Sequence, residues 1–254
     1  MHDFDIINDS TPIIFARKKN DCIATISGLP LIYHKDFDLN EFIGEDLARI
    51  RGVSSVHYFP LLFENKENVF GINNFFDKCF AIRTGSFDFK EAGVQYLSAC
   101  DLISKDGYPS LELLLCLCPD DKNREEFLDE LLEVYALDIY CAQIDRPYNI
   151  YYEIRQDGSV HVGKLFDYEQ SFDSSSGECY ASDFHMFNSI DDYQDFMVKY
   201  PSLKEKLTSY LDVDLARVVK NVADSRKFSL DGCYIDTFSR FDEVTHKKLE
   251  KFLK

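Results

Sequence analysis

Three side chains in the middle of the chain have the types and the spacing that transfer of a phosphoryl group requires. Asp145 and Asn149 stand four positions apart, and Asp167 follows them in the same part of the sequence. Phosphoryl transfer needs a carboxylate that orients the attacking hydroxyl, and it needs oxygen ligands that hold magnesium on the phosphates. The carboxylates of Asp145 and Asp167 and the amide of Asn149 are therefore candidates for these roles.

The elements around these residues would bring them together. An apolar face with acidic residues near its start predicts a long helix over about 123–141. A polar loop containing Asp145 and Asn149 follows, and then the turn residues Asp157-Gly158 between two strand-like runs predict a hairpin. Because this hairpin folds back on the loop, we expect Asp167 at its far end to approach Asp145 and Asn149.

The order of these features resembles a known catalytic segment. The pattern Asp-Arg-x-x-Asn at 145–149, then a hairpin, then Phe-Asp-Tyr at 166–168, is similar to the catalytic loop and metal-binding acid of HipA-like kinases and, more distantly, of phosphatidylinositol kinases. The resemblance implies that Asp145 is the catalytic acid. It also implies that Asn149 and Asp167 bind magnesium, with Asp167 equivalent to the first residue of the Asp-Phe-Gly motif.

Departures from the family pattern leave two other interpretations open. The loop from Asp145 to Asn149 is one residue shorter than usual, Pro147 replaces a frequent histidine, and Tyr168-Glu169 replaces Phe-Gly. A pseudokinase or non-enzymatic binding module would keep the fold without transfer. In an unrelated α+β fold, the same polar residues would be solvated loop residues.

The amino-terminal part of the sequence predicts a small β-rich unit. Short β-branched and aromatic runs between turn residues over 12–34 predict an antiparallel sheet, a helix is expected over 41–51 with Asn40 as its cap, and further strands are expected over 56–63 and 69–83. Beyond residue 189, amphipathic stretches predict helices over 191–199, 202–224 and 242–254.

Taken with the resemblance, these elements imply an α+β, two-lobed protein-kinase-like fold. Residues 1–103 would form a β-rich lobe that covers a nucleotide, and residues 104–254 a mainly helical catalytic lobe. The implied activity is ATP-dependent phosphotransfer with ATP and Mg²⁺ as cofactors. The acceptor that the resemblance implies is a serine or threonine of a protein, although a small molecule stays open.

A lysine near the start resembles the phosphate-binding lysine of kinases. Lys35 ends a strand-like run and precedes a helix that contains Glu41 and Glu45. We expect Lys35 and Glu45 to pair beside the nucleotide phosphates, with Lys18 or Lys19 as substitutes for Lys35.

The charge of the chain excludes some partners in this interpretation. The chain has 28 Lys and Arg against 45 Asp and Glu, which gives a net charge of −17 that repels nucleic acid and anionic membranes. The longest apolar stretch, over 111–118, is far too short to cross a bilayer. We therefore expect a cytoplasmic protein that binds ATP and an acceptor, and neither nucleic acid nor membrane.

Overall fold

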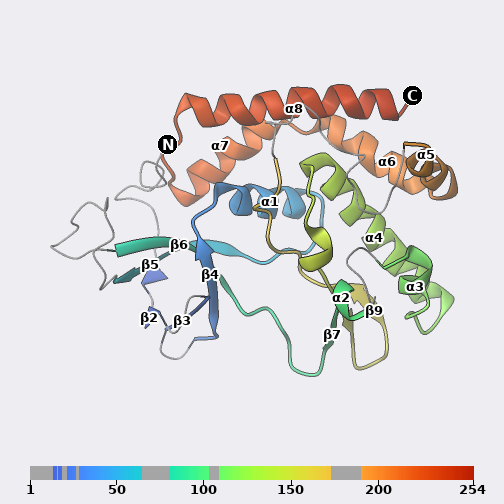
Figure 1. Cartoon of the computed structure of the whole chain (residues 1–254), viewed down its shortest axis with the longest axis horizontal. Helices are drawn as coiled ribbons and strands as arrows, with labels where there is room; N and C mark the ends of the chain where they lie inside the picture. Colours follow the sequence, from blue (N-terminus) through green and yellow to red (C-terminus); the bar gives the residue numbers. More distant parts are fainter. Residues whose placement is uncertain are drawn as a thin grey trace.

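The computed structural model describes residues 14–15, 17–18, 22–26, 29–64, 80–102, 109–172 and 190–254. They form a smaller lobe around a sheet and a mainly helical remainder, as Figure 1 shows. The α+β fold class expected from the sequence is confirmed. Lys19, positions 69–79 of the strand expected over 69–83, and the start of the chain lie outside the described residues.

The smaller lobe is built on a six-stranded sheet with the order β1-β5-β6-β4-β3-β2. Neighbouring strands are antiparallel, except that β1 and β5 run parallel. The alternation of side chains along β4 places Ile32 and His34 in the interior and leaves Tyr33 and Lys35 on the other face. The strands of this sheet are β1 (Ile14–Phe15), β2 (Arg17–Lys18), β3 (Ile23–Thr25), β4 (Ile32–Asp36), β5 (Tyr58–Glu64) and β6 (Phe80–Phe87).

Helix α1 (Leu39–Ile50) follows β4 and is enclosed by other elements. Its cap is Asp38 rather than the expected Asn40, because the Asp38 carboxylate accepts a hydrogen bond from the Asn40 amide at 2.8 Å. Leu39 and every residue of 41–48 are buried, including three acids. A helix that is buried on all its faces is held in one position by its neighbours.

A second, three-stranded sheet has the order β7-β8-β9 and contains the expected hairpin. Strands β8 (Tyr151–Ile154) and β9 (Val160–Val162) are antiparallel, and Gly158 in their turn has a φ of 84° that favours glycine. Strand β7 (Gln95–Ser98) pairs with β8, so this sheet joins residues on both sides of position 103. Helices α2 (Ala99–Leu102) and α3 (Leu111–Leu115) follow β7.

The larger lobe is centred on α4 (Asp121–Cys141), the long helix that the sequence predicts. The expected helix over 202–224 is wrong as a single element, because a 3-10 turn, η3 (Tyr210–Asp212), interrupts it and Asp214 caps a new helix by accepting from the Arg217 amide at 2.9 Å. In the described part of the chain, no helix combines the length and the apolar character that a membrane span needs. The remaining helices are α5 (Ile190–Lys199), α6 (Pro201–Ser209), α7 (Leu215–Arg226) and α8 (Gly232–Phe252).

Gly44 allows the two lobes to approach at α1. A Cβ atom at Gly44 would overlap with Cγ and the adjacent carbons of the Tyr168 ring, which is fully buried. We expect Gly44→Ala to lower the free energy of unfolding by about 2 kcal/mol or more, because overpacking outweighs the better helix propensity of alanine. Urea denaturation measures this loss.

Gly232→Ala is the matched control, since a Cβ atom at this helical glycine would have no neighbour within 4 Å. It should leave stability unchanged or raise it by a few tenths of a kcal/mol, roughly as glycine replacements at compatible sites do. Equal stability of the Gly44→Ala and Gly232→Ala proteins would show that the contact between Gly44 and Tyr168 is not tight.

Candidate functional site

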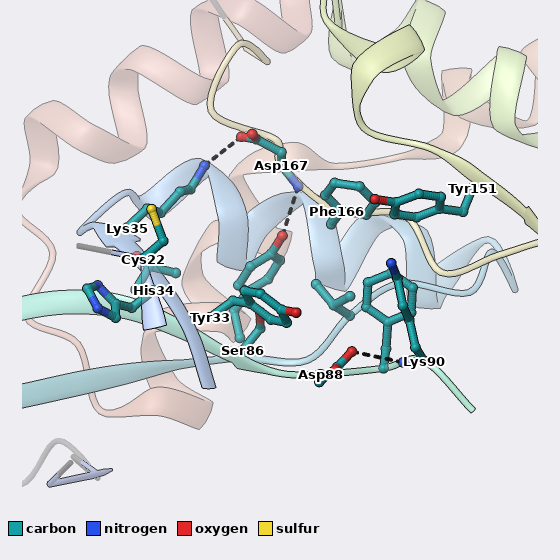
Figure 2. A pocket seen from close by; sticks show the side chains of 14 residues that line it. Cys22, Tyr33, His34, Lys35, Ser86, Asp88, Lys90, Tyr151, Phe166 and Asp167 are labelled. Carbon is teal, nitrogen blue, oxygen red and sulfur yellow. Dashed lines mark hydrogen bonds and ion pairs between the residues drawn. The ribbon is translucent and has the colours of Figure 1, made fainter. Parts of the chain in front are cut away.

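Lys35 lies at the centre of an ionic cluster between the two lobes. Its Nζ lies 2.5 Å from Oδ1 of Asp167 and 3.2 Å from Oε2 of Glu169, and it also forms an ion pair with Oε1 of Glu41. Figure 2 shows the Lys35 side chain extending toward the Asp167 carboxylate. The strand β4, the helix α1 and the segment after β9 thus meet at one ammonium group.

The pairing of Lys35 with Glu45 expected from the sequence is wrong. Glu45 accepts instead from Nη2 of Arg226 at 2.5 Å and from the Tyr58 amide at 3.1 Å, and its Oε1 lies 2.6 Å from Nδ1 of His57. Glu41 stands one turn earlier, in the first turn of α1 next to the end of β4, and reaches Lys35. Glu45 points instead toward the end of α7.

The charges in this cluster shift the proton affinities of its members. Burial lowers the pKa of the Lys35 ammonium, but the adjacent Glu41 and Asp167 carboxylates outweigh it and raise that pKa above its usual value. Complete burial raises the pKa of Glu41, while the Lys35 charge opposes the rise. Lys35 is therefore a cation throughout the physiological pH range.

The backbone around Asp167 is fixed by three hydrogen bonds. The Asp167 amide donates to the Tyr58 hydroxyl at 2.8 Å, and its carbonyl accepts from Nε2 of Gln143 at 2.7 Å. The next amide, of Tyr168, donates to Oε2 of Glu41 at 3.0 Å. Asp167 has a φ of 60°, in the left-handed region that aspartate and asparagine tolerate better than most residues. Glu41 therefore holds both Lys35 and the backbone that follows Asp167.

The loop after α4 brings Asp145 and Asn149 together. A short 3-10 turn, η2 (Arg146–Tyr148), separates them, and Nδ2 of Asn149 donates to the Asp145 carbonyl at 2.9 Å and to its Oδ2 at 3.1 Å. These bonds fix the Asp145 carboxylate relative to a buried amide. The Asn149 oxygen Oδ1 is the atom that remains for a metal ion.

Gln143 links the two halves of the site and was missed by the sequence reasoning. Its Oε1 accepts from the Asp145 amide at 3.0 Å, while its Nε2 donates to the Asp167 carbonyl. Gln143 is buried. Its position two residues before Asp145 was the available signal, although a glutamine in a polar loop usually indicates only a solvated residue.

Arg146 is the second residue that the sequence reasoning missed. The Arg146 side chain is fully buried against the equally buried Asp138 of α4, with Nε and Nη2 both within 3.1 Å of its carboxylate. Its Nη1 donates to the carbonyls of Asn149 at 3.1 Å and Phe166 at 2.8 Å. Arg146 therefore connects α4, the loop and the residue before Asp167.

A pocket of about 310 Å³ opens beside this cluster, between the two lobes. Lys35 and Asp167 lie at one end, as Figure 2 shows, and the rings of Tyr151 and Phe166 lie at the other. The Tyr151 and Phe166 rings stack with centroids 5.5 Å apart, and the centroid of the Phe89 ring lies within 6.0 Å of both centroids. The other lining residues are Cys22, Tyr33, His34, Val56, Tyr58, Thr84, Ser86, Asp88 and Lys90. The pocket thus has an ionic end at Lys35 and Asp167 and an aromatic end, where Nζ of Lys90 lies 4.7 Å from the centroid of the Tyr151 ring.

The described residues contain no group of three or more His, Cys, Asp or Glu side chains that could hold a metal ion by themselves. Magnesium does not require such a group, because it commonly binds through one or two protein oxygens together with substrate phosphates and water. Asp167 and Asn149 are of the right type for that arrangement.

Comparisons with known proteins show similarity at the level of the fold. A scan against protein-family models and a search of curated proteins found no match. Among solved structures, the chain is similar to HipA of the Shewanella oneidensis MR-1 toxin–antitoxin system, with a TM-score of 0.58 and 14% identity. That match covers 91% of this chain but only 60% of the other. The Helicobacter pylori proinflammatory kinase CtkA matches with a TM-score of 0.58 and 12% identity over 94% of this chain and 99% of the other.

The first of these structures overturns the exclusion of nucleic acid as a partner. It is a complex of HipA and HipB with operator DNA, so a protein of this fold occurs in a nucleic-acid assembly. A net charge of −17 describes the whole chain and does not decide what one surface of an assembly contacts. The similarity itself does not show that this chain binds DNA. It does show the fold, and the chain has the fold of the HipA-like kinases.

Proposed function

We propose that the chain is an ATP-dependent phosphotransferase of the cytoplasm, and that its acceptor is a serine or threonine hydroxyl of a protein. The observation that carries this proposal is the contact between Lys35 and Asp167 at the charged end of the pocket. A fixed cation beside a metal-binding type of acid suits the phosphates of a nucleotide.

The two ends of the pocket fit the two ends of ATP. Its volume lies at the lower limit of the range usual for sites that bind small molecules, roughly 300–1,000 Å³. The rings of Phe89, Tyr151 and Phe166 offer flat apolar surface for the adenine base. Lys35 at the opposite end would contact the phosphates, and Asp167 and Asn149 would hold the magnesium that neutralises their charge.

Asp145 would act on the acceptor. Its carboxylate is a hydrogen-bond acceptor that can orient a hydroxyl group and take its proton as the phosphoryl group is transferred. The bonds from Asn149 and Gln143 hold Asp145 in place. Because such positioning is most of what a protein contributes to phosphoryl transfer, this loop supports an active enzyme.

A pseudokinase is the second candidate, and one observation favours it. The Asn149 amide is already bonded to the Asp145 carboxylate within a loop that is one residue shorter than the family pattern. A carboxylate engaged in this way is a weaker partner for an acceptor hydroxyl. Such a protein would bind ATP without transferring its phosphoryl group.

Replacement of Lys35 tests whether the pocket binds ATP. We expect Lys35→Met to weaken Mg·ATP binding roughly tenfold or more, since a charge-assisted contact to phosphate is lost, and Lys35→Arg to weaken it less. Isothermal titration calorimetry with Mg·ATP, and with ATP plus a chelator, measures this change. Radiolabel transfer to protein acceptors then separates the enzyme from the pseudokinase.

Lys122→Met is the control, because Lys122 is an exposed lysine in the first turn of α4. It should bind Mg·ATP as the wild type does. If the wild-type protein neither binds Mg·ATP nor is stabilised by it, both candidate functions are wrong.

A further inference from the structure

The position of α1 decides where Lys35 lies. Glu41 of α1 pairs with Lys35 through Oε1 and accepts from the Tyr168 amide through Oε2. Near the start of the same helix, Nδ2 of Asn40 donates to the Ser171 carbonyl at 2.9 Å. A displacement of α1 would therefore disturb Lys35 and the segment that carries Asp167 together.

The end of α7 packs against α1 one helical turn after Glu41, at Glu45 and Phe42. Nη2 of Arg226 lies 2.5 Å from Oε2 of Glu45, and its guanidinium group lies over the Phe42 ring, 5.1 Å from the centroid. Lys227 ends α7 with a φ of 58°, and the next residue, Phe228, is buried. The Phe228 ring makes T-shaped contacts with two other rings. Its centroid lies 5.1 Å from that of Phe42 and 5.9 Å from that of Phe37. Figure 1 shows α7 running alongside α1.

We propose that the turn formed by Arg226, Lys227 and Phe228 is a positioning element of the nucleotide site. It holds α1 through Glu45 and Phe42, and α1 in turn holds Lys35 through Glu41. Glu41 and Glu45 stand about one helical turn apart on a rigid element, so a shift of one is transmitted to the other. This inference rests on the proposed function for its effect on nucleotide binding, although the effect on α1 itself does not.

A positioning role for this turn and a merely structural role predict changes in different measured quantities. A contact that only stabilises the fold alters the fraction of folded protein and leaves the affinity of the folded protein for Mg·ATP unchanged. A contact that positions Lys35 alters that affinity as well, and displacements near 1 Å are known to have effects of up to roughly a hundredfold in enzyme sites.

The test uses Arg226→Met, which keeps an apolar side chain over Phe42 and removes the charge opposite Glu45. We expect Mg·ATP affinity to fall roughly tenfold, amide hydrogen exchange in α1 to become faster, and acylation of the Lys35 amine by a lysine-specific reagent to become faster without nucleotide. Phe228→Leu and Glu45→Gln should change all three readouts in the same direction. The effects of Arg226→Met and Glu45→Gln on these readouts should not be additive, because both substitutions remove the same contact between Arg226 and Glu45.

Arg217→Met is the matched control, because Arg217 is an exposed arginine on the same helix. It should leave all three readouts at their wild-type values. A lower melting temperature of Arg226→Met with wild-type Mg·ATP affinity and wild-type acylation of Lys35 would overturn the positioning role.

The two proposals fail in different ways. If the wild type does not bind Mg·ATP, the proposed function is wrong, and hydrogen exchange and acylation of Lys35 still decide whether the turn holds α1. If the wild type binds Mg·ATP and Arg226→Met changes neither exchange nor acylation, the function stands and the positioning role is wrong.

Discussion

Asp145→Asn should lower phosphoryl transfer by a factor on the order of a hundred or more while Mg·ATP still binds and stabilises the protein. Asparagine keeps the shape of the side chain and loses the charge that orients the acceptor hydroxyl. Radiolabel transfer under saturating Mg·ATP measures the first effect, and a thermal-shift assay measures the second. A variant that transfers phosphate at the wild-type rate would contradict the role of Asp145.

Asp167→Asn is the comparison, because it should affect binding before it affects transfer. A hard cation prefers a charged oxygen, so the variant should lose most of the magnesium-dependent stabilisation by ATP. The backbone should not change, since asparagine also tolerates the φ of 60° at this position. Wild-type behaviour of both variants would show that the resemblance at 145–149 and 166–168 is coincidental.

Arg146→Met should produce the largest loss of stability among these variants, about 3–5 kcal/mol, because it leaves the Asp138 carboxylate buried without its partner. Both side chains are inaccessible to solvent in the wild type. Urea denaturation measures the loss. Arg155→Met is the control, since Arg155 forms only a half-exposed ion pair with Glu153 and should contribute less than about 1 kcal/mol.

The loss of stability caused by Arg146→Met should depend on pH. Complete burial raises the pKa of Asp138, and the Arg146 guanidinium opposes that rise. In Arg146→Met burial acts alone, so the folded-state pKa of Asp138 exceeds its value in the unfolded chain. Stability is then retained below about pH 4 and lost as pH rises through the folded-state pKa. The Asp138→Leu, Arg146→Met double variant should recover part of the loss and should not show this pH dependence.

The sequence was a good guide where local pattern determines structure. The long apolar face predicted α4, and Asp157-Gly158 predicted the turn between β8 and β9. Local pattern also explains the error over 202–224, where two amphipathic helices follow each other so closely that their apolar positions resemble one helix. The signal that could have separated them was Asp214, a helix-capping residue in the middle of the expected element.

The choice between Glu41 and Glu45 could not be made from the sequence. The two acids stand four positions apart and lie on the same side of α1, so their spacing fits a lysine partner equally well. Tertiary packing decides the matter, because the end of β4 lies at the first turn of α1 and Arg226 lies near the second. Arg226 is distant from both acids in the sequence, and no local pattern indicates it.

Gln143 and Arg146 were missed for a related reason. Polar residues in a loop are usually solvated, and the sequence does not reveal that this loop is covered by the segment that follows β9. Their burial results from contacts with Asp167 and Phe166, which are made only when the hairpin has folded back. The types of the candidate catalytic residues were therefore readable, whereas the residues that hold them were not.

The pocket takes its wall from both lobes: β4 and β6 supply one side, and Tyr151, Phe166 and Asp167 supply the other. A ligand bound there makes contacts that neither lobe offers alone, so its binding energy is lost when either lobe unfolds. Because unfolding of either lobe releases the ligand, the melting temperature of the protein should rise with ligand concentration. An occupied pocket then acts as a cross-link between the two lobes, and the rise in melting temperature becomes a measure of its occupancy.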